Sequence, residues 1–181
     1  VRVVFWAMHV NVWVESEQRH KSNEIILSRP HISTVVLYRR DSRTWDSEVA
    51  LVREFRSPVR NSRGFVYESP GGSSIKPGQN PYQVAVEEVR EETGLSITAD
   101  RVTALEDRQL LATFSTHKSH LFSVAVSDEE MAWFKSRVGV VCGAEEGDGP
   151  TGERTTCRRS VRSARSTEPP CGRFALSGPI Q

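Results

Sequence analysis

The stretch ESPGGSSIKPGQNPYQVAVEEVREETGLSI, residues 68–97, decides the fold because it joins a turn, a helix and a dense run of like charge. Pro70-Gly71-Gly72 is a strong turn signal after a short apolar run. Asn80 is a preferred N-cap, a proline follows at the first helical position, and Gly94 suits the C-terminal stop. These signals predict a helix over residues 81–93.

Four glutamates crowd this predicted helix, namely Glu87, Glu88, Glu91 and Glu92. Residues three or four apart share a helix face, so Glu88, Glu91 and Glu92 are expected to project together and to repel one another. A divalent cation would offset that repulsion, since carboxylate oxygens suit Mg²⁺ or Mn²⁺. For such a run alone, a solvated acidic face is the simpler interpretation. The glycine-rich loop before the helix favours a site, because backbone amides there can meet an anion.

The flanking sequence predicts strands and one further helix. Residues 5–15 alternate between apolar and polar side chains, which is typical of a half-buried strand. Residues 32–40 and 48–56 are two more strand-like runs separated by a polar segment, and they predict a hairpin. A short helix is expected over 128–137, capped by Ser127 or Asp128. Strands and helices in mixed order indicate an α/β or α+β domain.

The segment from Glu87 to Leu95 resembles the second half of the Nudix box, the signature motif of the Nudix hydrolase family. The match holds at every position except Glu87, where the family has arginine, and Gln79 stands in place of the box's first glutamate. The runs VALVREFRSPVR and ATFSTHKSHLFSVAV resemble strands of the branch that hydrolyses ADP-ribose and nucleoside diphosphate sugars. The resemblance covers about residues 30–137 and implies the Nudix α/β/α sandwich with a mixed β-sheet.

The resemblance also implies roles for individual residues. Glu88, Glu91 and Glu92 are expected to be catalytic and to bind the metal, together with the carbonyl of Gly71. The residues expected on the substrate side are Arg53, Arg56, Glu68 and Gly72, although a plain surface charge is an equal alternative for the two arginines. The general base is sought among Glu145, Glu146, Asp148 and Glu153, and the lone histidines His117 and His120 receive no role.

Two departures from the family motif occur as a pair. In the family, the arginine and the first glutamate of the box carry opposite charges and help to hold the loop on the helix. Here they are Glu87 and Gln79, and a glutamine amide can donate a hydrogen bond to a carboxylate. We therefore expect a hydrogen bond between Gln79 and Glu87 to replace the ion pair.

The resemblance and the composition together predict three parts. Residues 1–29 are an N-terminal strand region, the resemblance implies a Nudix core over 30–140, and composition marks 141–181 as a low-complexity tail. The tail is poor in apolar residues and is expected to be disordered, because it buries too little surface to offset its ordering entropy. An out-of-frame translation of a missing last strand and helix is an equal alternative. Read two bases later, codons for TCRRSVR could give an alternating Val-Gln-Glu-Val-Arg.

Charge and cysteine content limit the partners. The net charge is +1, from 24 basic and 23 acidic residues, which predicts no binding to nucleic acid or membrane surface. Three cysteines make a disulfide framework improbable and favour a reducing, cytoplasmic compartment. The expected activity is Mg²⁺-dependent hydrolysis of a nucleotide sugar such as ADP-ribose. A Nudix-fold binding module with weak or no turnover is the alternative. The strand at 5–15 would suit a homodimer contact or an edge strand of the monomer.

Overall fold

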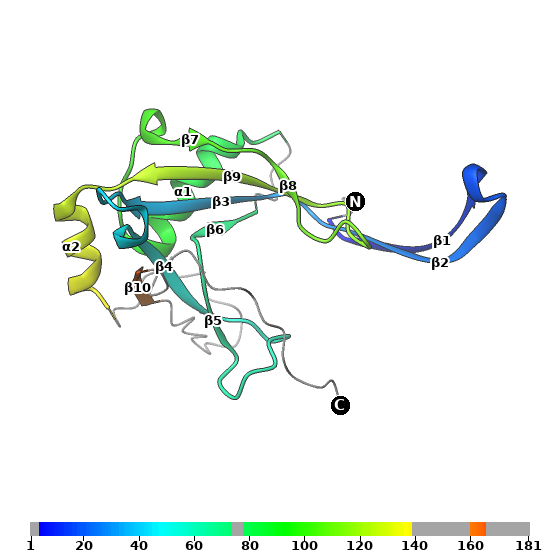
Figure 1. Ribbon diagram of the computed structural model, residues 1–181, viewed down its shortest axis with the longest axis horizontal. Coiled ribbons are helices and arrows are strands. Elements are labelled where there is room, and N and C mark those ends of the chain that lie inside the picture. The colour runs from blue at the N-terminus through cyan, green and yellow to red at the C-terminus, as the bar shows by residue number, and fades with distance from the viewer. Residues whose placement is uncertain (1–3, 74–77, 139–159, 166–181) are drawn as a thin grey trace, which may run out of the picture.

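Two separate β-sheets organise the chain (Figure 1). The structure is a computed structural model and describes residues 4–73, 78–138 and 160–165 of the chain. The smaller sheet is a hairpin of β1 (Trp6–Val14) and β2 (Arg19–Ser28), joined by a 3₁₀ helix at Glu15–Glu17. The larger sheet has eight strands: β3 (Ile32–Arg39), β4 (Glu48–Phe55), β5 (Phe65–Glu68), β6 (Gly71–Gly72), β7 (Thr103–Ala104), β8 (Arg108–Gln109), β9 (Lys118–Ala125) and β10 (Ser160–Arg165).

Strand β3 lies in the centre of the larger sheet and makes that sheet mixed. It runs parallel to β9 and antiparallel to β4, as the predicted hairpin requires. The pairing between β3 and β4 covers only residues 37–39 and 48–50, and β4 then continues alongside β5. Further back along β3, Ser33 and Thr34 pair with β6 instead. The divergence of β3 and β4 therefore brings β5 and β6 into the sheet beside the glycine turn.

The two α-helices begin and end at the capping residues seen in the sequence. Helix α1 spans Pro81–Thr93; the Asn80 side chain accepts a hydrogen bond from the amide of Tyr82, and Gly94 adopts φ 79°. Helix α2 spans Asp128–Ser136, and Ser127 forms a reciprocal capping box with Glu130. The remaining 3₁₀ helices are Thr44–Asp46 and Ala99–Arg101. Both α-helix predictions are confirmed, with α2 one residue shorter than expected.

A single apolar cluster joins the large sheet to both α-helices. The sheet contributes Val35, Leu37, Ala50, Phe122 and Val124, α1 contributes Ala85 and Val89, and α2 contributes Met131 and Phe134. Within the sheet, Leu37 pairs with Ala50 on β4 and with Val124 on β9, so these side chains share one face. Helix α1 lies behind the sheet in Figure 1 and covers this face. The mixed α/β fold with a mixed sheet is as expected.

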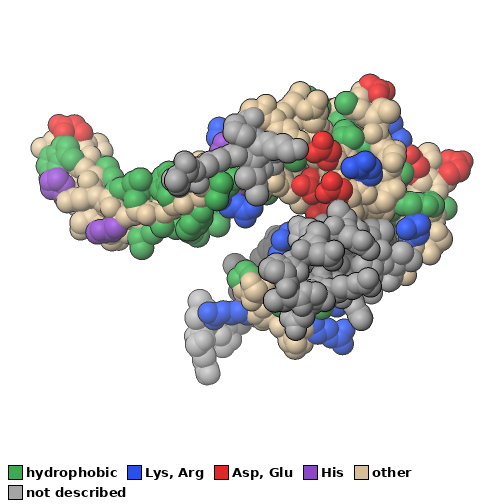
Figure 2. All heavy atoms as spheres, turned by 180° about the vertical axis from the view of Figure 1, so that it is seen from behind, with side chains coloured by type: hydrophobic (Ala, Val, Ile, Leu, Met, Phe, Trp, Pro, Cys, Tyr) green, Lys and Arg blue, Asp and Glu red, His purple; other side chains and the backbone are tan. Residues whose placement is uncertain are grey.

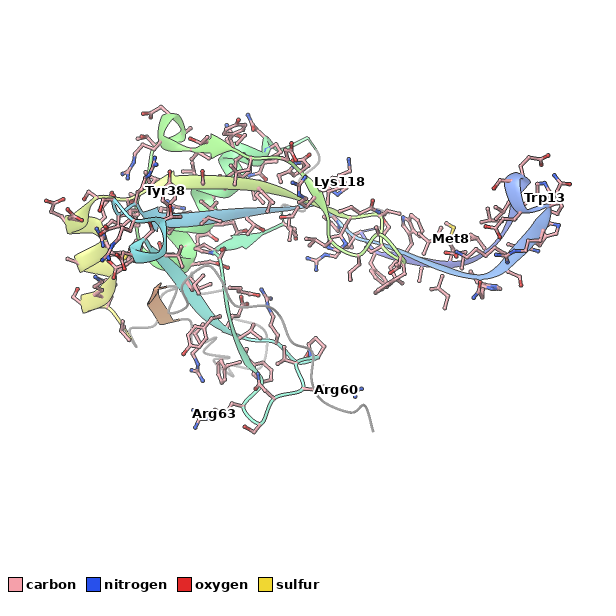
Figure 3. The ribbon with its side chains drawn as sticks, viewed as in Figure 1. Met8, Trp13, Tyr38, Arg60, Arg63 and Lys118 are labelled. Atoms are coloured by element: carbon pink, nitrogen blue, oxygen red, sulfur yellow. The ribbon has the colours of Figure 1, made fainter. Side chains whose placement is uncertain are left out.

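The β1–β2 hairpin projects from the rest of the molecule as an arm (Figures 1 and 3). Its base is anchored where Leu27 exchanges backbone hydrogen bonds with Phe114 and Thr116, at 2.7 and 2.9 Å. Among the described residues, β1 pairs only with β2. Residues 6–14 are thus an edge strand of the monomer, but in a two-stranded sheet of their own, because β1 finds its partner in the next segment of chain.

Residues 160–165 differ from the disorder expected for the tail. They form β10, which pairs antiparallel with β4 from Ser160 opposite Arg53 to Arg165 opposite Glu48. Backbone pairing at an open sheet edge needs no apolar composition, which explains why the sequence did not indicate this strand. The rest of 141–181, on which the alternative of an out-of-frame translation depends, lies outside the described residues. Within the part of the chain that the structure describes, no helix combines the length and apolar character needed to cross a membrane.

Candidate functional site

Two glutamates one turn apart on α1 face the two glycines of β6. An oxygen of Glu92, Oε2, accepts a hydrogen bond from the amide of Gly71 at 3.0 Å, and this side chain is only 3% exposed. Glu88 packs its carboxylate against Gly72. Figure 2, which views the molecule from the side of α1, shows acidic side chains gathered in the middle of this face. The structure thus brings Glu88 and Glu92 together beside the glycine turn.

Both glycines are required because atoms occupy the space a side chain would need. A Cβ on Gly71 would overlap the carbonyl oxygen of Ser33 and approach Cα of Thr34 at 3.0 Å. A Cβ on Gly72 would overlap the carboxylate of Glu88. The close approach of β6 to β3 on one side and to α1 on the other therefore depends on the missing side chains.

A second group of charges extends this site along β4 and β5. Nε of Arg56 donates to Oε1 of Glu68 at 3.0 Å, and Nη2 of Arg56 contacts the same oxygen. Nη2 also lies 2.8 Å from Oε2 of Glu54, which is 5% exposed; this contact is an ion pair, because its geometry does not make a hydrogen bond. Burial lowers the pKa of Arg56, but the hydrogen bond to Glu68 and the charges of Glu54, Glu68 and Glu92 outweigh it and raise that pKa. Arg56 therefore stays cationic beside the α1 carboxylates.

The expected substitute for the family's loop-to-helix ion pair is present. Nε2 of Gln79 donates to Oε2 of Glu87 at 3.0 Å, which links the loop to the first half of α1. Glu87 is exposed and lies on a different side of the helix from buried Glu92. The prediction of a Gln79–Glu87 hydrogen bond is confirmed. The extra carboxylate at position 87 is thus occupied in holding the loop.

Glu91 is placed differently from its two neighbours. Its side chain is 43% exposed, and Oε1 lies 3.9 Å from Nη2 of Arg90. In the described part of the chain, no three acidic, histidine or cysteine side chains gather closely enough to enclose an ion. The donor set still fits Mg²⁺, since this ion is commonly held by one or two carboxylates, with water and substrate phosphates completing its shell. Glu88 and Glu92 are the residues that would hold it, and the ligand roles of all three glutamates and of the Gly71 carbonyl stay predictions.

Arg53 is not brought to this site. Its guanidinium lies over the ring of Phe65 at 3.7 Å from the ring centre. Alternate residues of a strand point to opposite faces, so Arg53 points away from the face that carries Glu54. Arg60 and Arg63 lie on the loop between β4 and β5, away from the body (Figure 3). Of the two arginines expected on the substrate side, the structure brings only Arg56 to the carboxylates.

Sequence reasoning missed Glu54. The available signal was its period-2 relation to Ala50 and Val52, which places a carboxylate on the core face of β4.

His117 and His120 lie outside the carboxylate group: Nδ1 of His117 contacts Oγ of Ser115 at 2.6 Å, and Nδ1 of His120 lies 3.0 Å from Asp107. The residues considered for the general base, Glu145, Glu146, Asp148 and Glu153, lie outside the described residues.

The fold and the site together define a class of protein. It is an α/β domain in which an acidic helix face lies against a glycine turn. The NUDIX domain matches residues 28–154, most of the chain, and the chain belongs to the Nudix family. Members of this family are pyrophosphohydrolases of nucleoside diphosphate derivatives and generally use divalent metal ions such as Mg²⁺. No curated protein matches the chain. Among solved structures, a T. brucei MERS1–RNA complex is similar at 18% identity and TM-score 0.43, over 55% of this chain and 35% of that one.

Proposed function

We propose that the protein hydrolyses the diphosphate bond of a nucleoside diphosphate sugar, such as ADP-ribose, giving a nucleoside monophosphate and a sugar phosphate. The observation that carries this proposal is the placement of Glu88 and Glu92 against Gly71 and Gly72, with Arg56 nearby. The preference for a sugar-linked diphosphate rests on the resemblance of residues 49–60 and 112–126 to that branch of the family. The alternative of a nucleic-acid substrate receives no support from the net charge of +1.

The carboxylates and the arginine of this site would have different roles in the reaction. Glu88 and Glu92 provide carboxylate oxygens that would hold Mg²⁺, and the hydrogen bond from Gly71 keeps Glu92 in position. The cation would neutralise the diphosphate and activate the attacking water. Arg56 is held by Glu54 and Glu68. It would bind a phosphate oxygen and stabilise the negative charge that develops on the leaving phosphate.

Hydrolysis of a small panel tests the activity. ADP-ribose, UDP-glucose, NADH and dGTP are incubated with the protein in Mg²⁺ or in EDTA, and the nucleoside monophosphate released is measured by chromatography. We expect Mg²⁺-dependent release from a sugar-linked diphosphate. A bound metal contributes several kcal/mol of transition-state stabilisation, so loss of a metal ligand in Glu92→Gln should lower kcat by about 100-fold or more. Glu106→Gln, at an exposed carboxylate that pairs with Arg108, is the control and should keep the wild-type rate.

Two results would change the proposal. Turnover of dGTP alone would move the substrate to a nucleoside triphosphate while keeping the metal site. No turnover of any compound by cooperatively folded protein would favour a Nudix-fold binding module. Glu91→Gln measured in the same assay shows whether that exposed carboxylate takes part, and an unchanged rate would remove it from the metal site.

A further inference from the structure

Two carboxylates hold one edge of the Arg56 guanidinium. Nε and Nη2 of Arg56 both contact Glu68, and Nη2 also contacts Glu54. An arginine side chain has five N–H donors in one plane, two of them on Nη1. Among the described residues, no partner contacts Nη1 of Arg56, and the arginine side chain is 44% exposed. The bound edge is therefore fixed within the protein, while the other edge remains available to a ligand.

Glu54 is the unusual member of this group because it is a buried charge. It follows Ala50 and Val52 on the core face of β4, where a hydrophobic residue would satisfy the strand pattern. A buried ion pair contributes little net stability compared with apolar packing, because both ions lose their hydration. Glu48 on the same strand is also buried and paired, so burial alone assigns no role. Glu54 differs because its partner Arg56 lies within the field of Glu92 on α1.

The strand register explains how Glu54 and Glu68 reach the same guanidinium. Val52 pairs with Glu68 and Glu54 pairs with Val66 across the β4–β5 ladder, so both carboxylates lie on the face that α1 covers. Arg56 follows directly after β4 and is tied by its amide to the carbonyl of Gly64 at 2.8 Å. The backbone and both carboxylates therefore restrict where the guanidinium can lie.

We propose that Glu54 is a positioning residue, which holds Arg56 so that its Nη1 edge meets a diphosphate oxygen of the substrate. This inference rests on the proposed hydrolysis and specifies which cation binds the diphosphate. Arginine recognises phosphate through paired N–H donors in a fixed plane, so its orientation decides how well it binds. An arginine already fixed in place loses less conformational entropy when the ligand arrives.

The same strand offers a matched control. Glu48 lies at the opposite end of β4, is 2% exposed, and pairs with Arg39 at 2.9 Å and with Lys135 at 2.8 Å. Glu48→Gln and Glu54→Gln both neutralise a buried, paired carboxylate of β4. Both variants are expected to lower the thermal midpoint. Only Glu54→Gln should change how the protein binds its ligand.

Steady-state kinetics at saturating Mg²⁺ test the proposal. We expect Glu54→Gln to raise KM for the hydrolysed sugar diphosphate roughly tenfold, with a smaller change in kcat, since one charged contact to the guanidinium is weakened. Arg56→Lys keeps the charge but lacks the planar fork and should raise KM by a similar factor. In the double variant the two effects on KM should not add, because the proposed effect of Glu54 on the ligand passes through Arg56. Additive effects, or a KM for Glu54→Gln equal to that of Glu48→Gln, would overturn the proposal.

A second measurement does not depend on turnover. The Nη2–H resonances of Arg56 are assigned by their loss in Arg56→Lys, and their exchange with water is measured by NMR with and without AMP. Glu54→Gln should speed this exchange and weaken AMP binding roughly tenfold, whereas Glu48→Gln should change neither. Unchanged exchange and AMP affinity in Glu54→Gln would refute the positioning role, whether or not the protein is an enzyme. If Glu54→Gln does not fold, Glu68→Gln, at the 34% exposed partner, replaces it with the same expected results.

Discussion

Nε2 of Gln79 donates a hydrogen bond to Oε2 of Glu87 at 3.0 Å, so a neutral amide and a carboxylate join the loop to α1. We expect Gln79→Glu to replace this bond with a repulsive carboxylate pair. Loss of one hydrogen bond to a charged group at an exposed position should lower the free energy of unfolding by about 0.5–1.5 kcal/mol. Urea denaturation at pH 7 measures the loss.

The reciprocal change should repair it. Gln79→Glu combined with Glu87→Arg places opposite charges at the same two positions, as in the family's usual box. The double variant should regain most of the stability lost by Gln79→Glu, and a double-mutant cycle gives the coupling free energy. A double variant less stable than both single variants would show that the two side chains do not act as a pair.

Gly72→Ala should damage the site more than the fold. The added methyl would overlap the carboxylate of Glu88, which is a movable side chain, so Glu88 shifts and the metal-dependent rate falls. Gly71→Ala meets backbone atoms of Ser33 and Thr34 and should instead lower the thermal midpoint strongly.

Gly78→Ala is the control for these glycine substitutions. Gly78 adopts φ +69° and has no atom within 4 Å of an added Cβ, so only backbone strain of about 1–2 kcal/mol is expected. Thermal melts and metal-dependent rates of the three variants separate the effects. A rate for Gly72→Ala equal to that of Gly78→Ala would contradict the close packing of Glu88 on β6.

Glu130 should make stability depend on pH in the acid range. It accepts hydrogen bonds from Arg101 at 2.7 and 2.8 Å and completes the capping box of α2. The hydrogen bond from Arg101 lowers the pKa of Glu130 below its usual value of 4.5, despite the opposing effect of burial. A carboxylate with a lowered folded pKa stabilises the protein above its unfolded pKa, and that contribution is lost as the pH falls through the lowered value.

The measurement compares Glu130→Gln with the wild type. At pH 7 the variant should unfold with about 1–2 kcal/mol less free energy, through the weakened cap and lost charge pairing. The difference should shrink as the pH falls below 4.5 and through the lowered pKa of Glu130, because the wild-type carboxyl also becomes protonated. A difference that stays constant over this range would show that the charge of Glu130 makes no contribution.

The β1–β2 arm should mediate self-association. It exposes several large apolar side chains: Trp6, Met8, Val12, Trp13 and Ile25. A two-stranded hairpin is at best marginally stable alone in water, and apolar patches of this kind commonly mark protein contacts. We expect a homodimer by sedimentation velocity, and Met8→Glu should convert it to monomer.

Val138→Glu is the control for the arm. Val138 is also an exposed apolar residue, 54% exposed, but it follows α2 rather than lying on the arm. This variant should keep the wild-type mass. A monomeric wild type over the concentration range of the measurement would remove the arm as a homodimer contact.

Local sequence signals were sufficient to predict several structural elements of this protein. The bounds of α1 follow from Asn80 and Gly94, because capping depends on residues within one turn of the helix end. The alternation of residues in β3 and β4 predicts the hairpin, since side chains of a strand alternate between faces whatever their tertiary partners. The Gln79–Glu87 bond was also predictable, because the two changed residues compensate each other chemically.

Only the tertiary structure decided which charges meet. Strand alternation separates Arg53 from Arg56 by face, but the meeting of Arg56 with Glu68 depends on the pairing of β4 with β5. Glu54 and Glu68 meet one guanidinium because β4 and β5 pair at this end of the sheet. The arm stands apart from the main sheet because β1 pairs with β2. The alternating pattern of a single strand does not specify which other strand it pairs with. Propensity and capping are local free energies, whereas burial and charge pairing arise only when distant segments pack together.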